Sequence, residues 1–179
     1  AICQGGHVYT WGHGENGKLG HQDNNDKKLP TKVSALLEKK VLAGKGACGF
    51  DHILLLTAGA EYGEIGREFG VTISPGLPMS MGANTAGQLG LDDNSGRPQW
   101  TPQILDKKLR NNIEGSIDAK GGSGMFEGNQ VTQVAAGQYY SLFLAGGKVW
   151  SCGQGDAGQL GLEKPPDDPN RPKFIPMRF

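Results

Sequence analysis

The stretch GHGENGKLG, residues 12–20, decides the fold, because two closely similar stretches follow it along the chain. They are GANTAGQLG, residues 82–90, and GQGDAGQLG, residues 153–161, so that the three copies begin 70 and 71 residues apart. Self-similarity at a nearly fixed period is typical of repeat architectures, in which each repeat is one small supersecondary unit. We therefore interpret this stretch as a structural element that the chain uses three times.

Two nucleotide-binding motifs overlap the first copy and compete with this interpretation. Residues 12–17 read G-x-G-x-x-G, as in dinucleotide-binding proteins, and residues 12–18 read G-x-x-x-x-G-K, as in phosphate-binding loops. The first motif needs a helix after its third glycine, but the following residues show no helical periodicity. The second motif needs a serine or threonine where Leu19 stands, and glutamine replaces Lys18 in both later copies. The sequence therefore favours a backbone turn and predicts no bound nucleotide or other cofactor.

Repeated glycines at fixed positions indicate a turn of fixed backbone geometry, because glycine adopts positive φ angles readily. The leucine near the end of each copy is expected to pack into a core between neighbouring units. The expected structural positions are Gly12, Gly17, Leu19 and Gly20 in the first copy, Gly82, Gly87, Leu89 and Gly90 in the second, and Gly153, Gly158, Leu160 and Gly161 in the third.

Short strands are predicted on both sides of the turn. The segments VYTW (residues 8–11), PMSM (78–81) and VWSC (149–152) lead directly into the three copies. The compact apolar runs HILLLT (52–57) and SLFL (141–144) have the length and composition of buried strands. The sequence therefore indicates a fold that is built mainly from short β-strands.

A second recurring motif completes the repeat, because residues 41–56 resemble residues 131–144. The segment VSALLEKKV, residues 33–41, fits either a helical turn or the edge of a strand. Short glycine-bounded strands in such repeats predict an all-β fold of β-propeller blades, with about two and a half to three repeats forming a partial ring. We treat residues 1–179 as one domain with repeats near 5–57, 78–145 and 146–179 and insertions at 58–77 and 106–130.

Composition excludes several classes of ligand. The 18 basic residues balance the 18 acidic ones, so no long-range field would draw nucleic acid or an anionic membrane to the chain. No apolar run approaches the length of a membrane span. Cys3, Cys48 and Cys152 are far apart and form no CxxC pair, which argues against a zinc site or a disulfide framework and fits a reducing compartment. The expected partner is a protein rather than a metal ion or a membrane, and the expected location is the nucleus or the cytoplasm.

The two motifs together resemble the repeat of the regulator of chromosome condensation (RCC1) family. The shared pattern is a strand followed by G-x-x-x-x-G-[KQ]-L-G, then a proline-flanked apolar segment, then [AG]-x-G-[FQ]-x-x-x-L-x-L. The resemblance covers nearly the whole chain apart from the two insertions, and it implies part of a seven-bladed β-propeller. The founding member promotes guanine-nucleotide exchange on the small GTPase Ran and also docks on nucleosomes. Other members are adaptor or regulatory propellers attached to ubiquitin ligases, kinases or membrane-traffic proteins.

The resemblance also implies two residues that contact the GTPase. In the Ran exchanger an acidic residue in a loop of the G-x-D-H type helps to make this contact, and residues 49–52, GFDH, match that loop. The candidate contacts are therefore Asp51 and His52, whereas the corresponding loop GQYY, residues 137–140, has lost both side chains. The competing interpretation is structural, because an aspartate in a turn usually bonds its own backbone and a histidine before a buried strand usually pairs with a neighbouring carbonyl.

Two functions stay open at this point, and neither requires covalent chemistry or catalytic residues. The first is a binding platform that promotes nucleotide exchange on a Ran-like GTPase. The second is an adaptor propeller without exchange activity. Contact with chromatin would need a basic tail or patch, and the sequence shows neither. Loop aromatics such as Tyr139 and Phe126 could contact a partner or pack between neighbouring blades.

Overall fold

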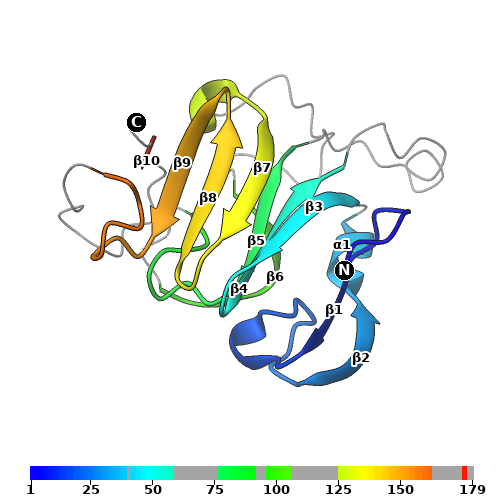
Figure 1. Ribbon diagram of the computed structural model, residues 1–179. Coiled ribbons are helices and arrows are strands. Elements are labelled where there is room, and N and C mark those ends of the chain that lie inside the picture. The colour runs from blue at the N-terminus through cyan, green and yellow to red at the C-terminus, as the bar shows by residue number, and fades with distance from the viewer. Residues whose placement is uncertain (40, 59–75, 92–95, 106–124, 163–174, 177–179) are drawn as a thin grey trace.

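The computed structural model describes residues 1–39, 41–58, 76–91, 96–105, 125–162 and 175–176. This part of the chain is mainly β, as the sequence predicts, and its strands form three antiparallel sheets that lie side by side (Figure 1). The strands are β1 (Tyr9–Gly12), β2 (Lys27–Lys32), β3 (Ala43–Cys48), β4 (His52–Thr57), β5 (Pro78–Gly82), β6 (Gln99–Ile104), β7 (Val131–Ala136), β8 (Tyr140–Ala145), β9 (Lys148–Gly153) and β10 (Ile175–Pro176). The helical elements are α1 (Ser34–Glu38) and the short turns η1 (Glu15–Gly17) and η3 (Met125–Gly128).

Each four-stranded sheet combines strands from two successive repeats. The first sheet pairs β1 with β2, the second has the order β3-β4-β5-β6, and the third has the order β10-β9-β8-β7. In the second sheet, β3 and β4 belong to the first predicted repeat and β5 and β6 to the next, and the third sheet is divided in the same way. Backbone hydrogen bonds therefore join neighbouring repeats within one sheet. The repeat boundaries stay a prediction, and most of both insertions, at 59–75 and 106–124, lies outside the described residues.

Strand β4 is buried on both of its faces, which explains why its sequence is a continuous apolar run rather than an alternating one. Leu54 and Leu56 belong to the core between the second and third sheets, together with Leu89 and Phe143. Leu55 points the other way and belongs to the core between the first and second sheets. Because successive side chains alternate between the two faces of a strand, one short segment contributes to both cores.

The ambiguous segment at residues 33–41 contains the helix α1. Ala35 and Leu36 of this helix are buried in the core between the first and second sheets. The Lys39 ammonium follows the helix and donates a hydrogen bond of 2.9 Å to the carbonyl oxygen of Pro102 in β6. The helix is therefore held to the second sheet both by apolar packing and by this bond.

The repeated glycine turn places its recurring glycines in the same backbone region in all three copies, although only the first copy has Asn16 at a φ of 60° within η1. The nine glycines that recur at the first, sixth and ninth positions of the three copies have φ angles between 62° and 109°, and the three turn leucines are all buried. After η1 the next regular element in the described chain is strand β2, so no helix starts at the third glycine of the nucleotide-like motif. The carbonyl of each turn leucine accepts a hydrogen bond from a hydroxyl in the preceding strand: Thr10 to Leu19 at 2.6 Å, Ser80 to Leu89 at 2.9 Å and Ser151 to Leu160 at 2.9 Å.

The first glycine of the turn also permits a close backbone approach. A Cβ atom on Gly82 would lie 2.3 Å from the carbonyl oxygen of Asp51, and one on Gly153 would lie 2.4 Å from that of Tyr139. A side chain at either position would therefore push the preceding hairpin loop away from the strand. Gly12 has a similar φ of 98°, but a Cβ atom there would meet nothing within 4 Å. The glycine requirement is therefore stronger in the second and third copies.

Candidate protein-contact site

Two equivalent hairpin loops lie beside the glycine turns, at the lower ends of the second and third sheets in Figure 1. The loop at residues 49–52 joins β3 to β4, and the loop at residues 137–140 joins β7 to β8. In the first loop the amide of Gly49 donates to the carbonyl of His52 at 2.8 Å, and in the second the amide of Gly137 donates to the carbonyl of Tyr140 at 2.9 Å. The matching bonds show that residues 51 and 139 occupy the same place in successive sheets.

Each loop is also bonded to the glycine turn that follows it. The amide of Ala83 donates to the carbonyl of Asp51 at 2.7 Å, and the amide of Gln154 donates to the carbonyl of Tyr139 at 2.9 Å. These bonds use only backbone atoms, so they do not depend on the side chains that differ between the two loops. The two loops therefore share one scaffold on which the first repeat carries an aspartate and the second a tyrosine.

The His52 side chain lies inside the fold, with 1% of its surface exposed. Its Nε2 is 2.9 Å from the Ser141 hydroxyl, which donates its own proton to the Gln88 carbonyl at 2.7 Å. Since a serine hydroxyl has one proton, Nε2 must be the donor to Ser141. The resulting chain of bonds links β4, β8 and the second glycine turn.

The environment of His52 favours the neutral imidazole. Burial lowers its pKa to about 4, against the opposing influence of the Asp51 carboxylate and the Tyr140 backbone. Its Nδ1 is buried and has no hydrogen-bond partner among the described residues. A contact between His52 and a GTPase stays a prediction, and it would require this side chain to leave its buried position.

The Asp51 carboxylate forms an ion pair with the Lys18 ammonium of the first glycine turn. The two side chains are 16% and 15% exposed, and the pair connects the first sheet to the second. In the other two copies of the turn, Gln88 and Gln159 accept a hydrogen bond from the amide two residues earlier, at 2.9 and 2.8 Å. Sequence reasoning correctly treated lysine as dispensable for the turn, but it missed this partner.

The most exposed aromatic side chain of the two loops is Phe50, of which 62% is exposed. Its ring and the Tyr139 ring pack edge to face at a centroid distance of 6.0 Å, so the tips of the two neighbouring loops touch. Phe126, another loop aromatic, is instead buried and packs against Phe143 and Trp150 at 5.5 and 5.7 Å. The structure therefore separates the exposed Phe50 ring, which lies beside the half-buried Tyr139, from Phe126, which only fills the core.

Comparison with known proteins identifies the family of this chain. Residues 5–56 match the model of the Regulator of chromosome condensation (RCC1) repeat. The chain belongs to the RCC1 repeat family. It is 32% identical to human E3 ubiquitin-protein ligase HERC2 over 162 residues, covering 90% of this chain and 3% of HERC2. It is 27% identical to mouse Protein RCC2 over 161 residues, covering 89% of this chain and 24% of RCC2.

A solved structure shares the fold of this RCC1-repeat chain over nearly its whole length. The crystal structure of Prp20p from Saccharomyces cerevisiae, a protein with binding properties to Gsp1p and histones, matches with a TM-score of 0.60 at 21% identity. The match covers 97% of this chain and 36% of that one. The prediction of a partial ring of RCC1-type propeller blades is therefore confirmed, and the chain spans about a third of such a propeller.

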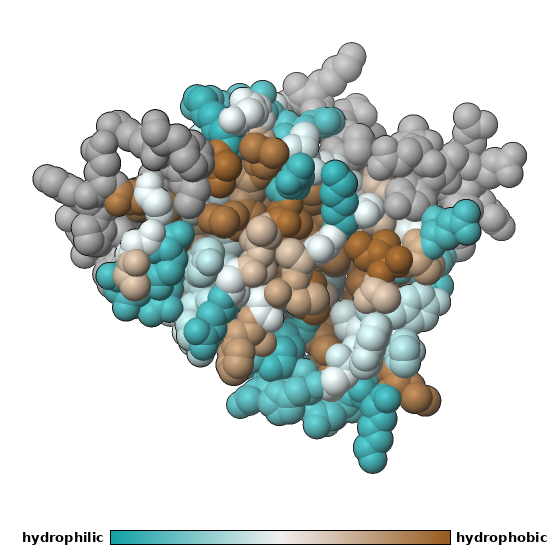
Figure 2. All heavy atoms as spheres, viewed as in Figure 1, coloured by the Kyte–Doolittle hydropathy of each residue, from teal (hydrophilic) through white to brown (hydrophobic). Residues whose placement is uncertain are grey.

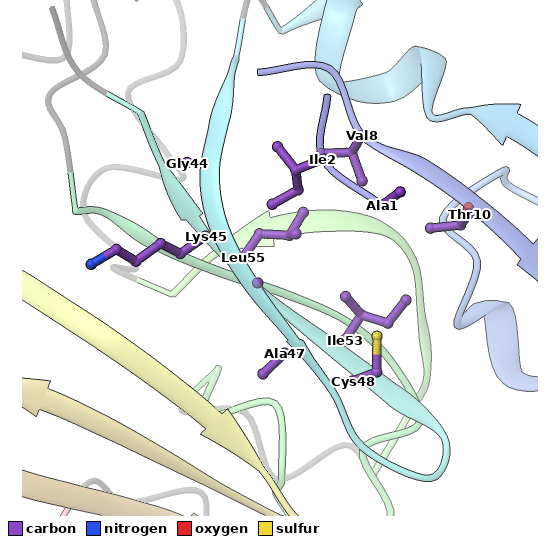
Figure 3. A pocket seen from close by; sticks show the side chains of 11 residues that line it. Ala1, Ile2, Val8, Thr10, Gly44, Lys45, Ala47, Cys48, Ile53 and Leu55 are labelled. Atoms are coloured by element: carbon purple, nitrogen blue, oxygen red, sulfur yellow. The ribbon is translucent and has the colours of Figure 1, made fainter. Parts of the chain in front are cut away.

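An apolar pocket of about 300 Å³ lies between the first sheet of the RCC1 repeats and strands β3 and β4 (Figure 3). Ile2, Val8 and Leu55 line it, whereas the Lys45 side chain points away from them and its ammonium donates to the Thr132 carbonyl at 2.9 Å. This lining suits an apolar group better than a nucleotide phosphate. Within the described part of the chain, no three His, Cys, Asp or Glu residues could hold a metal ion together.

The three cysteines lie in different environments. Cys3 and Cys48 are exposed free thiols, and Cys152 is a buried one. Burial raises the pKa of the Cys152 thiol, which donates a hydrogen bond of 3.7 Å to the Gln88 carbonyl. None of the helices in the described ranges is long and apolar enough to cross a membrane.

Proposed function

We propose that this chain is part of a non-catalytic protein-binding platform. Its contact face is formed by the hairpin loops and glycine turns at one end of the sheets. The observation that carries the proposal is the exposed Phe50 ring next to Tyr139, on a loop whose backbone is bonded to the neighbouring turn. Exposed aromatic side chains on a rigid scaffold are frequent anchors in protein interfaces. Figure 2, drawn from the same side as Figure 1, shows hydrophilic residues mixed with some apolar ones at the lower end of the molecule, and apolar residues gathered across its middle.

The first version of this function is guanine-nucleotide exchange on a Ran-type GTPase. The structural relative Prp20p has binding properties to Gsp1p and histones, and the loop with Asp51 matches the G-x-D-H type of loop. A platform that binds the nucleotide-free GTPase more tightly than the loaded form shifts the equilibrium toward nucleotide release. No covalent step is needed, and the charge balance of the chain adds no attraction to histone-bound DNA.

The test is the release of a fluorescent guanine nucleotide from loaded Ran on addition of this protein. We expect release to accelerate with protein concentration, and Asp51→Asn to reduce the effect. Glu127→Gln, which removes an exposed carboxylate that lies outside the hairpin loops and glycine turns, is the matched control and should leave release unchanged. An unaltered release rate at micromolar protein would end the exchange version.

The second version is an adaptor that binds a protein partner without exchange activity. Two observations favour it: the Asp51 carboxylate is paired with Lys18, and His52 is buried. The name of one relative, E3 ubiquitin-protein ligase HERC2, fits a binding domain attached to a separate activity. Binding of Ran without faster nucleotide release would support this version over the first. We expect a location in the nucleus or the cytoplasm for either.

A further inference from the structure

Two positions differ together between successive repeats of this chain. The first glycine turn carries Lys18, and the hairpin loop beside it carries Asp51. At the next junction the corresponding residues are Gln88 and Tyr139. The Gln88 amide oxygen stays within its own turn and accepts from the Ala86 amide at 2.9 Å, whereas the Lys18 side chain leaves its turn to reach the next sheet. The lysine and the aspartate therefore form one unit that the second junction lacks.

The Lys18–Asp51 pair acts on a loop that all three sheets touch. The second sheet holds its backbone, through the bond from the Ala83 amide to the Asp51 carbonyl. The third sheet contacts its tip, where the Phe50 ring meets Tyr139. Lys18 supplies the contact from the first sheet. Because Phe50 and Asp51 are adjacent in the chain, a force that holds the Asp51 side chain also limits where the Phe50 ring can lie.

The charge at this site is already balanced. Lys18 contacts Oδ1 of Asp51, and the two partly buried charges neutralise each other. A partner that offered a cation to Asp51 would have to compete with an ammonium that is already in contact, and a partner that offered an anion would meet the carboxylate. The exposed surface next to the pair is instead aromatic, with 62% of Phe50 open to solvent. Such a surface fits an uncharged apolar or aromatic side chain.

We propose that the Lys18–Asp51 pair is a positioning device that fixes the loop at residues 49–52. In this assignment the contact with the protein partner is made by Phe50 and Tyr139, which receive an apolar side chain of the partner, and not by the Asp51 carboxylate. The contact half of the assignment rests on the proposed binding function. The positioning half concerns this chain alone.

The positioning half is tested by NMR on the isolated chain, through the nuclear Overhauser effects between the Phe50 and Tyr139 rings. Lys18→Gln introduces the residue of the other two turns, and it should weaken these effects, as should Asp51→Asn. The charge-swapped double variant, Lys18→Asp with Asp51→Lys, should restore them. Lys148→Gln, which breaks the exposed ion pair with Glu127 elsewhere on the chain, is the control for loss of a charge and should leave them unchanged.

Unchanged ring contacts in both single variants would overturn the positioning role, and so would a failure of the charge swap to restore them in a chain with a native circular dichroism spectrum. If a single variant does not fold, the swapped chain still decides the question, because a restored fold with restored contacts supports the assignment. A restored fold without these contacts contradicts it.

The contact half is tested by titrating nucleotide-free Ran against the same variants and Phe50→Ala. We expect Phe50→Ala to weaken binding about tenfold or more, and the charge-swapped chain to bind within about threefold of the unmodified chain. Direct contact through Asp51 predicts the reverse, with the charge-swapped chain failing to bind and Phe50→Ala nearly unaffected. If the unmodified chain does not bind Ran, the exchange function and the contact assignment both fall, while the NMR result still decides the positioning role.

Discussion

Acidification should destabilise this protein through His52, whose imidazole donates to Ser141 in the chain of hydrogen bonds that links two sheets and a glycine turn. In the folded state its pKa is lowered to about 4, whereas an unfolded chain protonates its histidines near the ordinary value of 6.5. Below pH 6.5 the unfolded state therefore binds a proton that the folded state does not bind, and the free energy of unfolding falls as the pH falls. The contribution is fully present above pH 6.5 and is lost as the pH approaches 4.

The size of the effect follows from the shift in pKa. Each unit of pKa difference corresponds to about 1.4 kcal/mol, so the interval from 6.5 to about 4 is equivalent to about 3 kcal/mol. At about pH 4.5 most of this, about 2.5 kcal/mol, should already be lost. A domain of ordinary stability has about 5–15 kcal/mol in total, so the loss should be easy to measure.

The assay is urea unfolding followed by tryptophan fluorescence at several pH values between about 7.5 and 4.5. Other groups also titrate in this range, including His21 and His7, so the absolute slope is not diagnostic. His52→Gln provides the reference, because its amide can still donate to the Ser141 hydroxyl but cannot take up a proton. We expect the free energy of unfolding to fall by about 2.5 kcal/mol more in the unmodified chain than in His52→Gln. Equal slopes for the two chains would refute the reasoning.

Three further outcomes follow from the repeat geometry. Gly82→Ala should lower the free energy of unfolding by about 3 kcal/mol, because the new methyl group clashes with the backbone and the residue is strained at positive φ. Gly12→Ala should lower it by about 1 kcal/mol, because it causes the strain without the clash. Similar losses at both positions would contradict the close backbone approach in the second copy. Leu89→Ala, at a fully buried position, should lower the free energy of unfolding by about 3 kcal/mol. Leu29→Ala, at a position that is 74% exposed, should lower it by less than about 0.5 kcal/mol. Urea unfolding measures the stability of all four variants. A thiol reagent should modify the two exposed cysteines of the folded chain at once and Cys152 only on unfolding, so rapid labelling of all three would show that this core is open.

Local backbone chemistry made the glycine turn and its strands predictable from the sequence. Each copy of the turn needs a glycine at positive φ and a leucine that packs into a core, as at Gly82 and Leu89, so the same residues recur in the sequence at each copy. The run at residues 52–57 was predicted as a strand because its length and composition suffice for that. Its period of two also places His52 on the same face as Leu54 and Leu56, and this signal could have indicated its burial.

The contacts between repeats could not be predicted in the same way. Lys18 and Asp51 are 33 residues apart, and nothing in either local sequence indicates that the first turn lies beside the loop of the following sheet. Ser141 is 89 residues from His52, and it lies in β8 directly after a loop that resembles the first one only in its backbone. The one available signal was the joint replacement of lysine and aspartate by glutamine and tyrosine at the second junction, and it becomes informative only when the two positions are known to be neighbours.

The division of each four-stranded sheet between two repeats bears on how such chains can grow or shrink during evolution. A duplication or deletion that spans one whole period regenerates a complete sheet at its new junction, because the incoming half meets the same kind of half that it replaces. A duplication or deletion that spans half a period brings together two half-sheets of the same kind, whose strand edges do not match. Gene rearrangements in this lineage should therefore be tolerated in steps of one period, wherever in the period the break occurs.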